Sequence, residues 1–278
     1  MKWISTALAV LATTGMIAQP TWQPDTNGDH VIDLDDFLDF LHIFGSVDAD
    51  MDGFYGPFDD CPEVAGTLNG CPEPSGCVPV DWQGYTYAAV QIADQCWLAE
   101  NLRSTEFANG DPIPLETGAA TAWIAFNDAP AACQYLWDDA NGAAYGLLYN
   151  GVAVLDPRGL CPTGWHVPSD LEWMALETEL GLTETELGTT GFRGAAASAL
   201  KDSTGWNGTN ASGWTGLPGG WRRNSGSWLA IGLSGIWWTS SPVGTSEGWF
   251  RSMHTNNEGI NRNTIALGDG MSVRCVLD

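Results

Sequence analysis

Hydrophobic and polar residues alternate over short stretches between residues 81 and 278. Glycine- and asparagine-rich segments separate these stretches, and few apolar residues recur at the spacing of a long helix. Alternation with a period of two predicts strands, and the intervening residue types favour turns. The pattern therefore predicts an α+β domain over residues 81–278, built from short strands, one clear helix and long loops.

The clear helix begins after Ser169. Glu172 follows three residues later, so the two residues form a capping box at the start of the helix. An apolar side follows and the pattern ends at Gly181; that side consists of Trp173, Met174, Leu176 and Leu180. We expect this side to pack against strands. A second, weaker helical pattern covers Ala195 to Lys201.

The first eighteen residues have the pattern of a signal peptide. Lys2 is followed by a short apolar stretch from Ile4 to Ala18, and the expected cleavage site lies after Ala18. This stretch is too short to span a membrane, and no later segment has eighteen uninterrupted apolar residues. We therefore expect a secreted or cell-surface protein that does not insert into the membrane.

The formal net charge of −24 and the pI of about 4.1 exclude two classes of partner. Nucleic acids and anionic membrane surfaces both require clustered lysine and arginine, which this chain lacks. The composition also divides the chain. Residues 81–278 hold thirteen of the fifteen tryptophans and every arginine. The expected parts are a signal peptide (1–18), acidic calcium-binding loops (19–60), a Cys/Pro/Gly-rich connector (61–80) and the folded domain (81–278).

Eleven aspartates lie between Asp25 and Asp60, and no lysine or arginine occurs from residue 3 to residue 102. The first aspartates match a twelve-residue calcium loop, in which side-chain oxygens bind the ion and position 7 contributes a backbone carbonyl. The predicted Ca²⁺ ligands are Asp25, Asn27, Asp29, Val31, Asp33 and Asp36. The apolar residues of segment 37–44 fit an exit helix.

A second run repeats this spacing and has Gly53 at position 6, where the loop must turn. Its predicted ligands are Asp48, Asp50, Asp52, Phe54 and Asp59. Both loops end in aspartate rather than in the glutamate that binds calcium through two oxygens, which favours a structural, extracellular site. The alternative for both loops is an acidic linker whose charge only keeps the chain in solution.

Seven cysteines in an exported chain indicate disulfides, and the odd number leaves at least one cysteine without an intramolecular partner. Cys61, Cys71 and Cys77 lie in the connector, where we expect one local bridge. The spacing alone does not give the connectivity.

Several short segments of the folded part follow one another in an order that matches a known family. They are 90–102 (VQIADQCWLAENL), 145–150 (YGLLYN), 161–173 (CPTGWHVPSDLEW), 200–201 (LK), 217–220 (LPGG), 237–241 (WWTSS) and 270–275 (GMSVRC). In this series the chain resembles the Fibrobacter succinogenes major paralogous (FISUMP) domain, a bacterial family with a C-type-lectin-like fold. The resemblance spans most of residues 81–278 and implies that fold, preceded by a small calcium-loop segment.

The resemblance also implies that Cys161 pairs with Cys275, and it makes Cys96 with Cys133 a second bridge. Segments 59–62 and 69–72 of the acidic part are similar to a thrombospondin type 3 calcium repeat, and the first loop is similar to half of a dockerin. The second loop lacks the helix that a dockerin has, so a cohesin-type partner is not expected.

Tryptophan can stack on the apolar face of a sugar ring and donate a hydrogen bond from its N–H. Most tryptophans are expected in the core, above all the five that fall in the family segments, which are Trp97, Trp165, Trp173, Trp237 and Trp238. A stretch rich in Gly, Asn, Ser and Thr differs, since loops of this kind hold function when a rigid scaffold carries them. The residues predicted to bind a ligand there are Trp214, Trp221, Arg222 and Trp228.

Signals for catalysis are weak. Ser246 lies in a G-x-S-x-G match, but in a polar loop that lacks the strand–turn–helix context of a nucleophile. His166 lies in a structural family segment, and Glu172 is used as a helix cap. The fold is shared with formylglycine-generating enzymes, which use reactive thiols, but a disulfide at Cys275 would remove that nucleophile.

These patterns favour an exported, non-enzymatic, lectin-like binding protein with extracellular or cell-surface polysaccharide as its partner and Ca²⁺ bound by its N-terminal segment. Two alternatives remain open. One is an enzyme of the formylglycine-generating or polysaccharide-acting class, and the other is a purely structural role in a surface layer.

Calcium should shorten and stiffen residues 25–60, because carboxylates a few ångströms apart repel one another until a cation neutralises them. Proteases should therefore cleave this segment more slowly with calcium than with a chelator, and the circular dichroism spectrum should change with the ion. Equal cleavage rates between residues 25 and 60 under both conditions would contradict the calcium loops.

Overall fold

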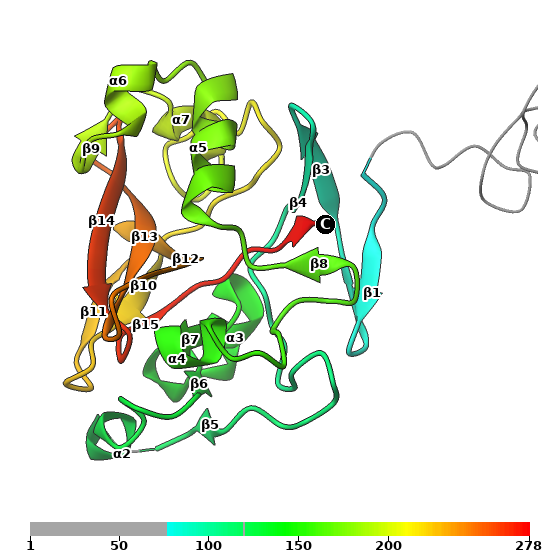
Figure 1. Ribbon diagram of the computed structural model, residues 1–278, viewed down its shortest axis with the longest axis vertical. Coiled ribbons are helices and arrows are strands. Elements are labelled where there is room, and N and C mark those ends of the chain that lie inside the picture. The colour runs from blue at the N-terminus through cyan, green and yellow to red at the C-terminus, as the bar shows by residue number, and fades with distance from the viewer. Residues whose placement is uncertain (1–76, 119) are drawn as a thin grey trace, which may run out of the picture. The chain divides into compact units, whose positions relative to one another are not determined.

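A computed structural model describes residues 77–118 and 120–278. Backbone contacts divide the chain into two units, Met1–Ser75 and Gly76–Asp278, and the described residues belong to the second. This unit mixes helices with strands that form three sheets (Figure 1). The α+β prediction is confirmed at this level, while the C-type-lectin-like fold stays a prediction. The predicted calcium ligands, from Asp25 to Asp59, lie outside the described residues.

The large sheet contains ten strands within the described residues. Nine of them lie side by side in the order β5 (Leu115–Glu116), β6 (Ala132–Cys133), β7 (Leu148–Asn150), β15 (Gly270–Met271), β10 (Gly219–Arg222), β12 (Ser234–Val243), β13 (Glu247–His254), β14 (Ile260–Ala266) and β9 (Gly191–Arg193). The tenth, β11 (Trp228–Ile231), pairs with β10. The longest pairing joins β12, β13 and β14 as an antiparallel meander.

Two smaller sheets and several short helices complete the unit. One sheet has the order β3 (Ala89–Ile92), β4 (Gln95–Leu98), β16 (Val276–Leu277) and β8 (Trp165–His166), and the other pairs β1 (Val80–Trp82) with β2 (Tyr85–Tyr87). The helices are α2 (Ala120–Ile124), η2 (Tyr135–Trp137), α3 (Asp139–Tyr145), α4 (Gly151–Val154), α5 (Asp170–Glu179), α6 (Glu184–Leu187) and α7 (Ala197–Leu200). Figure 1 shows α5, α6 and α7 grouped at one end of β13 and β14.

Helix α5 is the clear helix that the sequence predicts. The Ser169 hydroxyl accepts a hydrogen bond from the Glu172 amide, and the Glu172 carboxylate accepts one from the Ser169 amide, so the capping box is present. Trp173 and Leu176 are buried, as expected for an apolar side that packs on strands. The weaker pattern from Ala195 to Lys201 corresponds to α7.

Helix α5 covers one face of the β12–β14 meander with an aromatic core. Trp173 of the helix packs edge-on against Trp97 and Trp214, at centroid distances of 5.2 and 5.4 Å. Trp214 in turn contacts Trp237 of β12 at 5.0 Å. All four rings are fully buried, together with Met253 and Ile260 from β13 and β14. This face of the meander is therefore closed to solvent.

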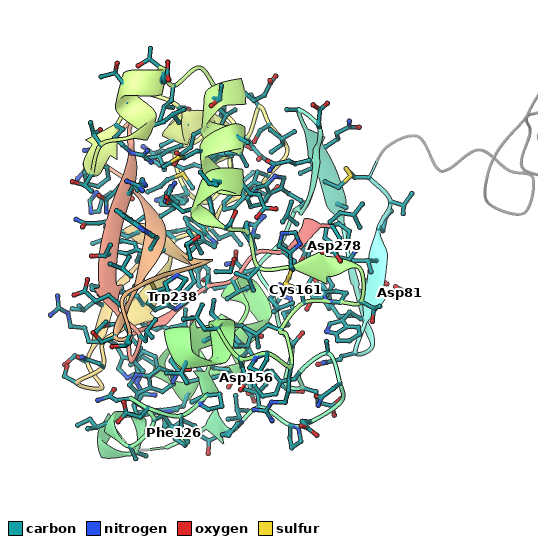
Figure 2. The ribbon with its side chains drawn as sticks, in the orientation of Figure 1. Asp81, Phe126, Asp156, Cys161, Trp238 and Asp278 are labelled. Carbon is teal, nitrogen blue, oxygen red and sulfur yellow. A yellow bond between two sulfur atoms is a disulfide. The ribbon has the colours of Figure 1, made fainter. Side chains whose placement is uncertain are left out.

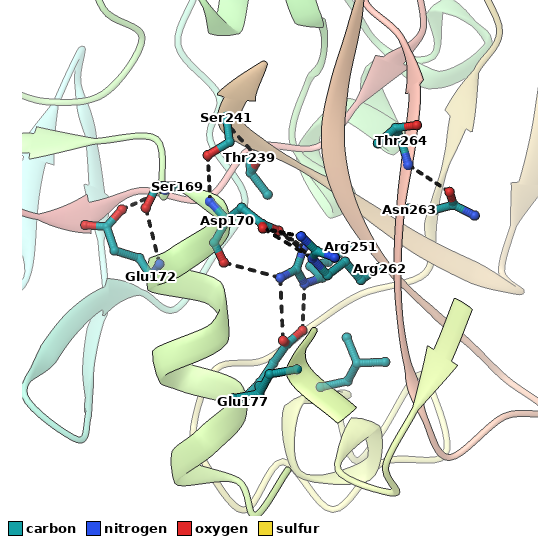
Figure 3. Close-up of polar contacts among 12 residues, drawn as sticks. Ser169, Asp170, Glu172, Glu177, Thr239, Ser241, Arg251, Arg262, Asn263 and Thr264 are labelled. Atoms are coloured by element: carbon teal, nitrogen blue, oxygen red, sulfur yellow. Dashed lines mark hydrogen bonds and ion pairs between the residues drawn. The ribbon is translucent and has the colours of Figure 1, made fainter. Parts of the chain in front are cut away.

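Buried ion pairs bind α5 to the same face (Figure 3). Arg251 of β13 lies directly opposite Arg262 of β14, and two like charges in such a pair destabilise a sheet. Asp170 separates them, since its carboxylate accepts hydrogen bonds from Arg251 at 2.7 Å and from Arg262 at 2.6 Å. Glu177, two helical turns later, binds Arg251 and Arg193 at 2.6 Å each. The helix therefore supplies the carboxylates that offset the repulsion between the paired arginines.

A second polar centre joins the family segments. The Asn101 Oδ1 atom accepts hydrogen bonds from the Trp237 indole and from Arg274, both at 2.8 Å. The Asn101 amide nitrogen donates to the Tyr145 carbonyl at 2.8 Å. Arg274 is fully buried, and its guanidinium lies 3.9 Å from the Trp214 ring centroid. Four of the segments that carry the family resemblance thus meet at the Asn101 side chain.

The disulfide prediction is right for one bridge and wrong for the other. Cys161 is bonded to Cys275, as the resemblance implies. Cys96 is bonded to Cys77 instead of Cys133, and Cys133 is a free, buried thiol. A disulfide requires Cα atoms within about 7 Å of each other, and Cys96 and Cys133 lie on β4 and β6 of different sheets.

The two disulfides indicate an extracellular domain, because such bonds persist in oxidising compartments. None of the helices in the described part of the chain has the length and apolar character that crossing a membrane requires.

Replacing Glu177 by glutamine should destabilise the domain strongly. The change keeps the volume of the side chain but removes the carboxylate that binds Arg193 and one of the two carboxylates that bind Arg251, while Asp170 still pairs with Arg251. Removing one partner of a buried ion pair costs about 3–5 kcal/mol. Urea denaturation measures this loss. Glu179→Gln, on an exposed position of the same helix, is the control and should stay within about 0.5 kcal/mol of the unchanged protein. Equal effects of the two variants would contradict the structural role of the network.

Candidate functional site

The structure separates the four residues predicted to bind a ligand. Trp214 and Arg222 are both 0% exposed, so the prediction is wrong for these two side chains. Trp214 belongs to the aromatic core, since it packs between Trp173 and Trp237. The Gly- and Ser-rich sequence around it suggested an open loop, but the loop folds inward over Arg274.

Arg222 lies in a cage of aromatic rings. Its guanidinium carbon is 4.3 Å from the Trp228 ring centroid, 4.7 Å from that of Trp123 and 5.3 Å from that of Trp137. Arg222 also forms an ion pair with Glu116. Trp228 therefore covers a buried charge of the same chain. Its half-buried ring lines neither of the two cavities described below.

Trp221 is different, because it lines a groove on the other face of the meander. The groove has a volume of about 200 Å³. We call it the sheet groove. Its lining consists of Phe192, Trp221, Ser234, Ile236, Phe250, Ser252, His254 and Asn261.

The strand register brings these residues together. Ser234 lies opposite His254, and Ile236 lies opposite Ser252. Ser252 faces Asn261 across β13 and β14. Because side chains alternate between the two faces of a strand, these residues point away from the face that Trp237 and Arg251 bury under α5. The sheet groove thus lies on the face of the meander opposite the one that α5 covers.

The outer face is covered at one end and open at the other. The Trp238 indole donates to the Tyr149 carbonyl at 2.9 Å, and Trp238 is buried with Ala153 and Val154 of α4. At the other end Phe192 on β9 is 48% exposed, while Trp221 and Phe250 are half-buried. The Phe192 ring is therefore accessible to solvent.

The groove contains no lysine, arginine, aspartate or glutamate. Its polar groups are the Ser234 and Ser252 hydroxyls, the Asn261 amide and the His254 imidazole, and Asn261 donates to Ser252 at 3.0 Å. Arg223 lies nearby, with its guanidinium 5.1 Å from the Trp221 ring centroid. Aromatic surface beside uncharged hydrogen-bonding groups can hold a neutral, hydroxyl-bearing molecule.

A larger cleft of about 550 Å³ lies at the opposite end of the meander. It is lined by the turn residues Thr245 and Ser246, by α4 and by segment 266–268. No aromatic residue lines it, and its Asp156 (labelled in Figure 2) pairs with Arg158 at 2.8 Å. This cleft has the size of a ligand site but lacks a ring on which a ligand could stack.

The weak catalytic signals occupy structural positions. Ser246 lies in the tight turn between β12 and β13 rather than between a strand and a helix. Cys275 is consumed by its disulfide with Cys161. Burial raises the pKa of the Cys133 thiol to about 12, which leaves it protonated and a poor nucleophile at neutral pH.

His166 bridges two carboxylates at the edge where β8 meets β16. Its Nδ1 atom lies 2.6 Å from Asp278, labelled in Figure 2, and its Nε2 atom lies 2.7 Å from Glu172. Partial burial of the ring opposes its charge, but hydrogen bonds to Asp278 and Glu172 outweigh this and raise the pKa of His166. Burial acts against ionisation of Glu172 as well, yet hydrogen bonds from Ser169 and His166 lower its pKa. Both shifts favour the charged forms of the pair, and the bridge between two carboxylates suits a structural link better than a general base.

Comparison with known proteins gives one family. The family model described as the Fibrobacter succinogenes major domain matches residues 90–277. No curated protein matches the chain. No solved structure matches it either.

The link through His166 should weaken as the pH rises. Because the folded protein raises the pKa of His166 above the unfolded value of about 6.5, its contribution to stability is complete below that value and is lost as the pH passes through the folded pKa. Urea denaturation of the unchanged protein and of His166→Gln should show a difference that shrinks with rising pH. Asp278→Asn should reduce the same difference. A difference that is constant with pH would contradict the charged link.

Proposed function

This chain belongs to the Fibrobacter succinogenes major domain family, and from that premise we propose that it is an exported binding protein that uses the sheet groove to hold a neutral carbohydrate. The single observation that carries the proposal is that exposed Phe192 and half-buried Trp221 and Phe250 line one groove together with uncharged polar groups. The protein acts in this proposal without catalytic activity of its own, outside the cell or at its surface.

The chemistry of the lining supports a sugar. A pyranose ring has apolar C–H faces, which pack against aromatic rings, and hydroxyl groups around its edge, which exchange hydrogen bonds. Trp221 and Phe192 supply the aromatic surfaces, and Asn261 can both donate and accept. The indole N–H of Trp221 can donate a hydrogen bond to a sugar hydroxyl in this proposal.

The distribution of charge favours a neutral ligand. The protein has a net charge of −24, so an anionic polysaccharide is repelled at a distance. Among the described residues Arg223 is the one exposed cationic side chain, while six of the other lysines and arginines are buried. A cationic ligand finds no carboxylate in the groove lining. An uncharged ligand is not repelled by the net charge of the protein and needs no charged partner in the groove.

The enzymatic alternatives receive less support from the same residues. A formylglycine-generating mechanism requires an accessible reactive thiol. Cys275 is cross-linked, and the pKa of buried Cys133 is about 12. A glycosidase requires two carboxyl groups that flank one sugar bond, and the groove lining has none. The proposal keeps the N-terminal calcium loops, with Ca²⁺ ligands from Asp25 to Asp59, as a stiff spacer before the binding domain.

Trp221→Ala should weaken binding of neutral oligosaccharides at least about tenfold, because a few aromatic residues contribute most of the affinity of such sites. Isothermal titration of the full chain with cello-, xylo- and manno-oligosaccharides measures this loss. Asn261→Ala is a second variant, which removes hydrogen bonds without removing a ring and should also weaken binding.

The control is Leu171→Ala, which removes an exposed apolar side chain on α5, far from the groove in the sheet. It should leave the affinity unchanged. Polygalacturonate is the anionic comparison. Failure of all neutral oligosaccharides to bind, preferential binding of polygalacturonate, or unchanged affinity in both groove variants would overturn the proposal.

A further inference from the structure

The sheet groove has a direction that its lining residues define. In the register of the sheet, Ile236 lies beside Ser252, Ser252 beside Asn261 and Asn261 beside Phe192. The parallel pair Gly220 and Gly235 places Trp221 next to Ile236, one residue further along each strand. One row of side chains thus crosses β10, β12, β13, β14 and β9 at right angles to the strands.

The length of this row follows from the spacing of strands. Five adjacent strands are separated by four intervals, and at about 4.8 Å each these give a row of about 19 Å. Both ends of the row are aromatic, since Trp221 stands at one end and Phe192 at the other. A single sugar ring is too small to contact both ends at once.

The row is recessed at its centre. Ile236 is 5% exposed and Ser252 is 9% exposed, whereas Phe192 is 48% exposed. The centre of the row therefore forms a floor, whose polar part is the hydrogen-bonded pair of Asn261 and Ser252. A ligand that touches both aromatic ends also passes over these polar groups, where its hydroxyls find partners.

The groove also reaches the border of the sheet. Strand β9, which carries Phe192, is the last strand in the order of the large sheet. A chain that lies along the row can consequently continue past Phe192 into solvent. The geometry fits a stretch within a longer chain better than a closed cavity for a single ring.

Resting on the proposed function, we propose that the sheet groove binds an extended segment of neutral polysaccharide several rings long, laid across the strands from Trp221 to Phe192. Trp221 stacks on a ring at one end and Phe192 on a ring at the other. Asn261 and Ser252 exchange hydrogen bonds with the hydroxyls between them. The ligand class is a linear polymer of uncharged sugars, and the free monosaccharide is a poor ligand.

Dependence on chain length tests this inference. Isothermal titration of the full chain with β-1,4-linked oligosaccharides of glucose, xylose and mannose, from the disaccharide to the hexasaccharide, should show affinity rising at least tenfold along the series that binds. In Phe192→Ala the affinity for the disaccharide should change little, while most of the gain from longer chains should disappear. Phe192→Leu keeps apolar volume without a flat ring and should give the same loss.

Leu171→Ala is the matched control for removal of an exposed apolar side chain, and it should retain the full length dependence. Affinity that is independent of length, with binding preserved, would overturn the extended site while leaving the proposed function intact. An unchanged length dependence in both Phe192 variants would also overturn it. Absence of binding for every oligosaccharide would instead overturn the proposed function.

Discussion

The architecture depends on how the buried charges of one helix and two strands compensate each other. Arg251 and Arg262 are directly paired across β13 and β14, an arrangement that is unfavourable without carboxylates between them. Asp170 and Glu177 of α5 provide those carboxylates from within the protein. The requirement fixes the helix to this face of the meander, and Trp173 then completes the aromatic core. The alternating strand residues have to point to the opposite face, where the open end of the sheet forms the groove.

Local signals in the sequence predicted local structure well. The capping box at Ser169 determines where α5 begins, because it needs only residues three positions apart. A second box, Thr183 with Glu186, starts α6 and carries the same local signal. The family segments predicted the Cys161–Cys275 bond. They did not predict the partner of Cys96, because Cys77 lies before the matched region.

The groove could not be predicted in this way, because its residues meet only through strand register. Trp214 and Trp221 occur in similar polar stretches, yet the first lies under α5 and the second lines the outer face. Phe192 is separated from Trp221 by almost thirty residues in sequence, and β14 is needed to bring it to the groove. Alternation along β12 and β13 would have shown that Ser234, Ile236, Ser252 and His254 share a face, but not that this face is uncovered.

The family segments and the groove are separate parts of the sequence. Asn101, Trp237 and Arg274, which meet in one buried hydrogen-bonded centre, all come from the segments that carry the resemblance. None of the eight groove residues lies in those segments. The residues that carry the family resemblance therefore build the frame, and positions between them line the groove. Membership of the family consequently indicates the fold of this chain more directly than it indicates a ligand.

The bond between Cys77 and Cys96 determines how the domain responds to mechanical load. Tension that arrives along the backbone from residues before Cys77 crosses the disulfide directly to β4. Residues 78–95, including the hairpin of β1 and β2, then form a slack loop that bears no force. Without the disulfide the same tension would pass through the hairpin and pull β1 and β2 apart from their open end, where Val80 pairs with Tyr87. A protein held from its front end against flowing liquid would thus be pulled through a covalent link into the centre of its frame.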